Sequence, residues 1–259
     1  MRIDLHNHTP LCNHASGTPK AYIQQAINNN IDHFGFSDHA PMHFDQKYRM
    51  DFTQMPLYER DILHLKEQFK DQITILLGYE VDFLDGYIDE SVLRREVDYL
   101  IGSVHFLGKW GFDNPEFIGG FASKDIDHIW QEYFDSIEAL ANSGLFQIVG
   151  HLDLIKVFKF LPKKDVRLIA KNAIKAIKKA DLVVEINAAG LRKPISEAYP
   201  SCPLMELLSE QEIPITFGSD AHEVLHVGFA QEEILAYAKN YGYKKCATFS
   251  NKERKMVNF

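Results

Sequence analysis

The sequence predicts an α/β protein in which a parallel sheet of seven strands closes into a barrel, within a single domain over residues 1–259. Short apolar runs alternate with longer amphipathic segments along the chain, which is typical of successive βα units. A length of 259 residues suits one such domain, because α/β barrels of this size form single units. No repeat, low-complexity tract or linker divides the chain.

The strands are predicted at seven apolar runs, each short enough for a buried parallel strand. In chain order they span Ile3–Leu5, His33–Ser37, Ile73–Tyr79, Tyr99–Val104, Phe146–Gly150, Leu182–Ile186 and Ile215–Gly218. Three long loops, residues 39–54, 108–124 and 188–200, each follow a strand. In a βα barrel such loops form the carboxyl-terminal face, which carries function.

The helices are predicted where apolar residues recur at helical spacing between these runs. They span Pro19–Asn30, Leu57–Phe69, Ser91–Glu96, Ile126–Asn142, Lys163–Lys179, Pro203–Glu210 and Val227–Tyr241. Thr18 is a candidate N-cap, since Pro19 suits the first position of a helix. Gly144 follows the helix that ends at Asn142, as expected of a helix terminus.

The composition excludes several classes of protein. Apolar residues make up 46% of the chain, which supports a core, and the net charge of −8 lacks the basic field that binds nucleic-acid backbones. The three cysteines are isolated, and no apolar run approaches the ~18 residues of a membrane span. We expect a cytoplasmic protein that acts on a small charged substrate and binds neither nucleic acid nor a membrane. The sequence does not indicate an oligomeric state.

Two pairs of candidate metal ligands have i, i+2 spacing after predicted strands. His6 and His8 follow the first strand, and Asp220 and His222 follow the last. Because strand side chains alternate with a period of two, both members of a pair project to one side and can bind one ion. Taken alone, each pair is also compatible with surface histidines, or with a capping carboxylate at Asp220.

Further residues of metal-binding type stand at the ends of the other strands. They are His39, Glu80, His105 and His151, with His14 a short loop beyond the first pair. The carboxyl ends of barrel strands meet at one mouth, where ligands remote in sequence become neighbours. Their number exceeds the needs of one four-coordinate ion, so we expect two or three ions, and mixed imidazole and carboxylate ligands suit Zn, Mn or Fe.

Two cations follow the sixth predicted strand, in the loop that contains Arg192 and Lys193. Neighbouring metal ions generate hydroxide at neutral pH and stabilise phosphoryl oxygens, and an arginine fork binds the same oxygens. The predicted catalytic residues are Arg192, Asp220 and His222, and the predicted substrate-binding residues are Arg192, Lys193 and His43. Alternatively, residues 192 and 193 are solvent-exposed cations of a loop and take no part in binding.

Two motifs among these residues resemble those that open and close the PHP (polymerase and histidinol phosphatase) superfamily. They are Asp4-Leu5-His6-Asn7-His8-Thr9 and Gly218-Ser219-Asp220-Ala221-His222. The resemblance runs nearly end to end and implies a distorted (β/α)7, TIM-like barrel that binds three metal ions. By position it implies His6, His8, Glu80 and Asp220 on one ion, His14, His39 and His222 on a second, and Glu80, His105 and His151 on a third.

The segments 102–107, 110–115 and 187–200 resemble the histidinol-phosphatase branch of this superfamily. The branch implies hydrolysis of L-histidinol phosphate to L-histidinol and inorganic phosphate in histidine biosynthesis, with Arg192 at the phosphate. Ala188 and Ala189 depart from the branch where a hydroxyl residue is expected. The loop from Trp110 to Glu116 is where we expect contacts to the imidazole and amino groups.

Other functions use similar residues. A PHP-type phosphoesterase would act on another phosphomonoester or on nucleic-acid ends, and the second outcome would show as salt-sensitive DNA affinity. A metal-dependent hydrolase of C–N bonds would share the barrel and the first histidine pair, and amide substrates distinguish it. A metal-sensing or scaffold protein would keep the ligands without turnover.

Overall fold

The computed structural model describes residues 1–259, and its centre is a parallel sheet of seven strands in the order β1-β2-β3-β4-β7-β8-β9. They are β1 (Ile3–Asp4), β2 (His33–His39), β3 (Thr74–Asp82), β4 (Tyr99–Ser103), β7 (Ile148–Val149), β8 (Val183–Asn187) and β9 (Ile215–Gly218). Each overlaps one predicted strand, in the predicted order. β2 and β3 continue past their predicted ends, so His39 and Glu80 lie within the sheet itself.

The sheet closes through hydrogen bonds between its first and last strands. The Leu5 amide donates to the Phe217 carbonyl at 2.9 Å. Beyond the strand ends, the His8 amide donates to the Ala221 carbonyl at 3.0 Å, and the Ala221 amide donates to the His6 carbonyl at 3.3 Å. The predicted seven-stranded α/β barrel is therefore confirmed, and these bonds bring the segment after β1 beside the segment after β9.

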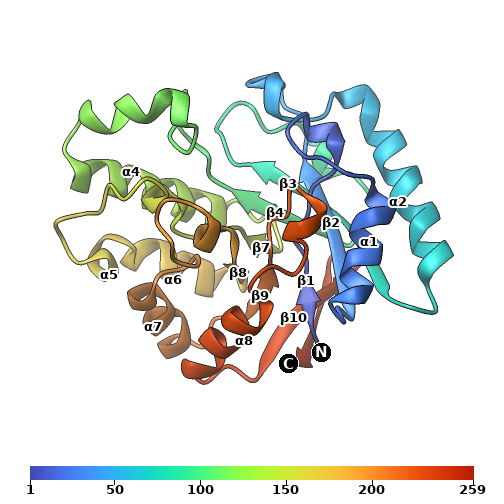
Figure 1. Cartoon of the computed structure of the whole chain (residues 1–259). Helices are drawn as coiled ribbons and strands as arrows, with labels where there is room; N and C mark the ends of the chain where they lie inside the picture. Colours follow the sequence, from blue (N-terminus) through green and yellow to red (C-terminus); the bar gives the residue numbers. More distant parts are fainter.

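Eight α-helices surround the barrel, with α4 to α7 on one side and α1 and α2 on the other (Figure 1). They are α1 (Pro19–Asn28), α2 (Met55–Phe69), α3 (Glu90–Leu93), α4 (Ile126–Asn142), α5 (Val166–Ile169), α6 (Lys171–Lys179), α7 (Cys202–Glu210) and α8 (Gln231–Asn240). α1 begins as predicted, because the Thr18 hydroxyl accepts a hydrogen bond from the Ala21 amide at 3.2 Å. None of the helices is both long enough and apolar enough to cross a membrane.

Two predicted helices differ from the structure. The segment 163–179 forms two helices, α5 and α6, which meet at Ala170, and α5 begins only after Asp165, whose side chain accepts from the Arg167 amide at 2.9 Å. α8 begins at Gln231 rather than Val227. Gly228 and Ala230 adopt positive φ values of 64° and 51°, which are incompatible with a right-handed helix.

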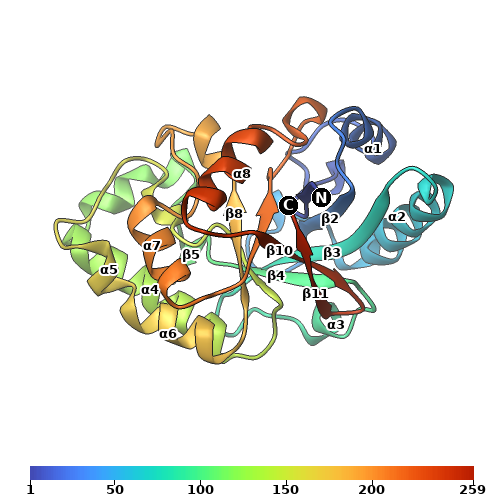
Figure 2. The same cartoon turned by 90° about the horizontal axis from the view of Figure 1, so that it is seen from below.

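Two hairpins were not predicted. β5 (Phe106–Leu107) and β6 (Trp110–Gly111) pair after β4, and the 3₁₀ helix Pro115–Ala122 follows them. β10 (Lys245–Ser250) and β11 (Glu253–Asn258) pair at the end of the chain and cross the bottom of the barrel, close to both termini (Figure 2). The Thr216 hydroxyl of β9 donates to the Ala247 carbonyl of β10 at 2.9 Å, which ties this hairpin to the sheet.

Tyr99 fills the interior of the barrel near its base. Its hydroxyl reaches from β4 to donate to the Leu5 carbonyl at 2.6 Å, and its ring lies 5.9 Å from that of Phe249 in β10. A Cβ atom at Gly35 or Gly78 would lie 2.1 Å or 2.7 Å from Tyr99, so both positions require glycine. The base is therefore closed by packing, and the carboxyl-terminal mouth is left for polar residues.

Candidate metal centre

The structure brings all nine predicted ligands together at the carboxyl-terminal mouth of the barrel. β2 and β3 carry His39 and Glu80, and the others lie in loops that follow strands. The nine are His6, His8, His14, His39, Glu80, His105, His151, Asp220 and His222. The potential metal-binding atoms form four groups, and within each group they lie within 4.8 Å of one another; two groups match the second and third sets implied by the sequence, and another contains His6, His8 and Glu80 of the first set.

The first set faces the barrel axis. His6 Nε2 lies 3.3 Å from Glu80 Oε2, and His8 Nε2 lies 3.2 Å from Asp220 Oδ1. The two cross-distances, His8 Nε2 to Glu80 Oε2 and His6 Nε2 to Asp220 Oδ1, are 3.7 Å and 3.9 Å. Ligands about 2.1 Å from a tetrahedral ion are separated by roughly 3.4 Å. Two nitrogens and two oxygens thus stand at spacings that suit one ion.

Glu80 connects this set to the third. Its Oε2 atom faces His6, whereas its Oε1 atom lies 2.9 Å from His151 Nε2 and 3.6 Å from His105 Nε2. The Ser103 hydroxyl donates to the same Oε1 atom at 2.7 Å and fixes the carboxylate. One carboxylate therefore presents an oxygen to each of two histidine clusters, which is the arrangement of a bridging ligand.

The second set consists of three imidazoles at the outer edge of the mouth. The ring of His14 lies 4.6 Å from that of His222 and 5.2 Å from that of His39. His14 is exposed, whereas the other two side chains are largely enclosed. A loop of five residues after His8 returns His14 to the cluster, as its spacing predicts.

Buried polar atoms without partners supply an independent test of the fit to metal. Five ring nitrogens in these sets are inaccessible to solvent and have no hydrogen-bond partner: His6 Nε2, His8 Nε2, His39 Nδ1, His151 Nδ1 and His222 Nε2. Burying a polar atom without a partner costs free energy, so such atoms are rare in folded proteins. Three of them, His6 Nε2, His8 Nε2 and His39 Nδ1, lie 3.0–3.3 Å from a carboxylate oxygen of Glu80 or Asp220, which fits divalent ions as the missing partners.

Three carboxylates that were not among the predicted ligands contact the Nδ1 atoms of ligand histidines, on the other side of the ring from Nε2. Glu185 Oε1 lies 2.7 Å from His6 Nδ1, Asp82 Oδ1 lies 2.7 Å from His105 Nδ1, and Asp38 Oδ1 lies 3.4 Å from His8 Nδ1. These contacts leave the Nε2 atoms for metal and fix each ring's orientation. All three carboxylates lie in strands, but the sequence alone does not show which imidazole each one faces.

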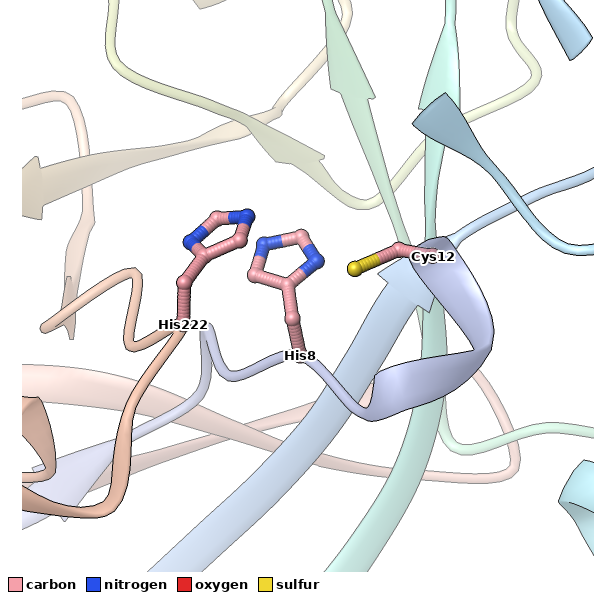
Figure 3. A group of neighbouring side chains, drawn as sticks. All are labelled: His8, Cys12 and His222. Atoms are coloured by element: carbon pink, nitrogen blue, oxygen red, sulfur yellow. The ribbon is translucent and has the colours of Figure 1, made fainter. Parts of the chain in front are cut away.

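Cys12 joins a fourth set of possible ligands, with His8 and His222. Figure 3 shows the imidazole of His8 between the other two side chains, so the thiol faces the ring edge that is turned away from His222. Cys12 is fully buried, and burial raises the pKa of its thiol far above the usual range. A neutral thiol packed behind His8 behaves as a small hydrophobic residue rather than as a metal ligand.

The field of the imidazoles controls the charge of the two central carboxylates. Burial opposes ionisation, but His6 and its neighbours hold the pKa values of Glu80 and Asp220 well below the usual range. Both groups are thus anionic at neutral pH, as metal binding requires. His39 behaves in the opposite way, because burial lowers its pKa to about 4 and keeps the ring neutral.

A cavity of about 560 Å³ opens above these residues, and Arg192 and Lys193 line it. Arg192 Nη2 donates to the carbonyls of Ser219 and Asp220 at 2.9 Å and 3.0 Å, and the guanidinium lies 4.9 Å from the ring of Phe229. Its Nη1 atom is buried and has no partner. The guanidinium is thus held in place with a free donor group beside the metal ligands.

The expectation for His43 is not met. Its side chain is 71% exposed, its ring lies 4.7 Å from that of Phe52, and it is absent from the cavity wall. The loop after β2 turns His43 outward and places Asp45, Tyr48 and Arg49 at the cavity instead. His226, which was not among the predicted site residues, also lines the cavity, and its Nδ1 atom is buried without a partner. No spacing pattern identified it.

Comparison with known proteins gives matches along the whole chain. Residues 4–189 match the PHP domain. A probable histidinol-phosphatase from Deinococcus radiodurans is 38% identical over 258 residues, which cover 98% of this chain and 97% of that protein. The histidinol-phosphatase of Bacillus subtilis is 28% identical, and the match covers 90% of this chain and 97% of that protein.

A solved structure has the same fold. It is the histidinol phosphate phosphatase of Lactococcus lactis subsp. lactis, complexed with Zn, L-histidinol and phosphate. The two chains superimpose with a TM-score of 0.79 at 21% sequence identity, and the match covers 98% of each. This likeness shows that the two chains share the barrel fold described above.

Proposed function

The chain belongs to the PHP domain family, and we propose that it is a histidinol-phosphatase, which hydrolyses L-histidinol phosphate to L-histidinol and inorganic phosphate. The observation that carries the proposal is geometric. Residues of all three metal-ligand sets line one cavity together with Arg192, whose Nη1 donor has no partner. The substrate is inferred from the Deinococcus relative, which matches at 38% identity over nearly the full length.

We assign three ions to the three sets. The first set is His6, His8, Glu80 and Asp220, the second is His14, His39 and His222, and the third is Glu80, His105 and His151. Imidazole and carboxylate ligands suit Zn, Mn or Fe. Ions held by these residues would act as Lewis acids toward the phosphoryl oxygens and would lower the pKa of water for attack on phosphorus.

The residues of the chain position and neutralise the phosphate. Arg192 is anchored by two carbonyls through Nη2, so its Nη1 donor keeps a fixed place beside the metal site. Burial lowers the pKa of the guanidinium, but an arginine in a protein remains charged. It therefore offers a preorganised positive charge to the phosphoryl oxygens. Lys193 is exposed at the cavity rim and adds a second, mobile charge.

Asp220 and His222 combine ligation with orientation. Asp220 has a positive φ of 52°, and this strained turn brings its carboxylate to His8 while its carbonyl accepts from Arg192. The same carbonyl lies 3.2 Å from His222 Nδ1. One residue thus couples the first set, the second set and the phosphate-binding arginine.

The bulk properties fit a small substrate in the cytoplasm. The net charge of −8 disfavours a polyanion such as DNA, and a 560 Å³ cavity suits a small molecule. We therefore include a cytoplasmic location and a phosphomonoester substrate in the proposal.

The direct test is phosphate release from L-histidinol phosphate by the purified protein, loaded with manganese or zinc and compared with chelator-treated protein. p-Nitrophenyl phosphate and single-stranded DNA serve as alternative substrates. We expect fast, metal-dependent turnover of L-histidinol phosphate. Turnover of only DNA or only p-nitrophenyl phosphate would keep the metal site and reject the substrate.

Arg192→Ala removes the anchored charge at the phosphate. Because one preorganised donor stabilises a transition state by about 3 kcal/mol, we expect kcat/KM for L-histidinol phosphate to fall about a hundredfold. Arg167→Ala is the matched control, since Arg167 is exposed on α5 and paired with Asp165, away from the cavity. Equal activity of the two variants would exclude Arg192 from phosphate binding.

A further inference from the structure

Asp113 lies on a short loop whose two ends are both anchored. On one side, Phe112 is fully buried, with its ring 5.5 Å from that of Tyr133 in α4. On the other side, the Asn114 side chain accepts from the Glu116 amide at 2.9 Å and caps the 3₁₀ helix Pro115–Ala122. Asp113 itself lines the cavity and is half-buried. Its carboxylate is thus held at the cavity wall by a firm scaffold.

Asp113 is the one carboxylate of the cavity wall that has no partner. Four acidic residues line the cavity, and three of them are engaged: Glu80 and Asp220 face imidazoles, and Asp45 Oδ2 lies 3.4 Å from Arg49 Nη2. The Asp113 carboxylate forms no ion pair and accepts no hydrogen bond from another residue. Burial raises the pKa of Asp113, because the charged carboxylate is less stable away from water.

Asp113 and the phosphate-binding cation stand near different sets of metal ligands. Among the groups that act on its charge are His105 and His151, which belong to the third metal set, and Asp82 behind His105. Arg192 is tied to Ser219 and Asp220 at the end of β9, beside the first set. The cavity therefore has a fixed cation beside the first metal set and an unpaired anion near the third.

We infer that Asp113 binds the ammonium group of the substrate and sets the specificity of the enzyme for amino-alcohol phosphates. This inference rests on the proposed function, because L-histidinol phosphate carries an ammonium group two carbon atoms from its ester oxygen. With the phosphoryl group at the metals and Arg192, the amine extends toward the His105 side of the cavity. There it meets the one carboxylate without a protein partner and neutralises it.

The variant that tests this is Asp113→Asn, which keeps the size of the side chain and removes its charge. Asp113 contacts no cation in the protein, so the variant is expected to fold and to melt at or above the wild-type temperature. Glu116→Gln is the matched control. It removes the same charge from the same loop. The sequence predicted substrate contacts from this whole loop, but in the structure Glu116 is exposed and lies outside the cavity wall, so it is not a substrate contact.

Two substrates separate amine binding from phosphate chemistry: L-histidinol phosphate and its deamino analogue, imidazolylpropyl phosphate. A hydrogen bond between charged groups contributes about 1.5–3 kcal/mol, so Asp113→Asn should raise KM for L-histidinol phosphate about tenfold or more. The KM of the deamino analogue and the kcat of both substrates should stay within about threefold of the wild-type values. Glu116→Gln should leave all four parameters unchanged.

Binding of the two products supplies a readout without turnover. In calorimetric titrations of the metal-loaded protein, Asp113→Asn should weaken the affinity for L-histidinol about tenfold and leave the affinity for inorganic phosphate unchanged. Weakened phosphate binding, or an equal loss of kcat on both substrates, would overturn the inference and place Asp113 at the metal centre. Unchanged KM and L-histidinol affinity would overturn it as well.

Failure of the proposed function looks different from failure of this inference. If the wild-type protein does not hydrolyse L-histidinol phosphate, the proposed function is wrong, and the inference falls with it. If the wild-type protein hydrolyses L-histidinol phosphate and Asp113→Asn does so with an unchanged KM, only the role of Asp113 is wrong.

Discussion

Single residues determine which nitrogen each proposed ligand offers to a metal. In five of the histidines, Nδ1 faces a fixed acceptor on the protein, which leaves Nε2 for the ion. The acceptors are Glu185 for His6, Asp38 for His8, the Cys12 carbonyl for His14, Asp82 for His105 and the Asp220 carbonyl for His222. Such contacts select one tautomer and orient the ring before any ion binds.

Glu185→Gln tests this orientation at the most enclosed histidine. Glu185 contacts His6 Nδ1 at 2.7 Å and also accepts from the His151 amide at 2.9 Å, so the variant disturbs two metal sets. Because loss of such an outer contact costs 10- to 100-fold in metal affinity, we expect about that loss in a zinc or manganese titration. Glu210→Gln, at an exposed position of α7, is the control. Unchanged metal affinity would contradict the role of Glu185.

The ligands other than His14 could be predicted from sequence because they lie at or just after a strand end, a position that periodicity locates without coordinates. His14 was predicted from its spacing to His8. The residues that support these ligands could not be predicted. Glu185 and Asp82 look like ordinary buried carboxylates until the fold shows which imidazole each one faces. His43 shows the reverse error, because a long loop places its residues according to packing, and packing turned this side chain outward.

Elements were predicted well where a pattern of apolar residues recorded their burial. β10 packs four consecutive buried residues beneath the barrel, whereas β11 is exposed along nearly its whole length. Apolar residues do not recur at strand spacing within Glu253–Asn258. The segment forms a strand because it pairs with β10. The hairpin could therefore not be predicted from local pattern, although it closes the base of the barrel.

Phe249→Ala tests whether this hairpin supports the barrel. Phe249 is 5% exposed and packs against Tyr99, and deletion of a buried aromatic ring costs about 3–5 kcal/mol. We expect a loss of about 3 kcal/mol in the free energy of unfolding, measured by urea denaturation. Met256→Ala, on the more exposed β11, should change stability by less than about 0.5 kcal/mol. Equal effects of the two variants would show that the hairpin is peripheral.

The whole molecule joins strand ends that are remote in sequence, and this is why function could be predicted from scattered residues. Closure of β1 on β9 places His8 beside Asp220, and the parallel order of the sheet adds the remaining ligands around the same mouth. We infer that residues 1–259 form a single domain, because the terminal hairpin packs on the barrel itself. The protonation states of the histidines at this mouth also affect the stability of the whole fold.

Removal of the metals should make stability fall as pH rises. In the metal-free protein, burial lowers the pKa of both rings, but Asp220 and Asp38 raise that of His8 to about 9, and Asp82 and Glu80 raise that of His105 to about 10. In the unfolded chain both rings have a pKa near 6.5. Protonation therefore favours the folded state below pH ~6.5, and this contribution is lost as pH rises through the folded-state pKa values.

Melting temperatures of chelator-treated protein between pH 6.5 and 10 give the measurement. We expect a steady decrease over this range. Metal-loaded protein serves as the control, and its melting temperature should be higher and should fall less, because bound ions replace protons as the partners of Glu80 and Asp220. Parallel curves for the two forms would contradict the charge states assigned to His8 and His105.

The two-sided carboxylate of Glu80 has a consequence for how the proposed ions load. An ion in the first set and an ion in the third set would each fix the same side chain and draw on the same negative charge. Their affinities therefore cannot be independent, and by thermodynamic reciprocity each changes the other by the same factor. Occupancy is then a cooperative property of the cluster, and a half-filled centre is a distinct chemical state rather than an average of full and empty ones.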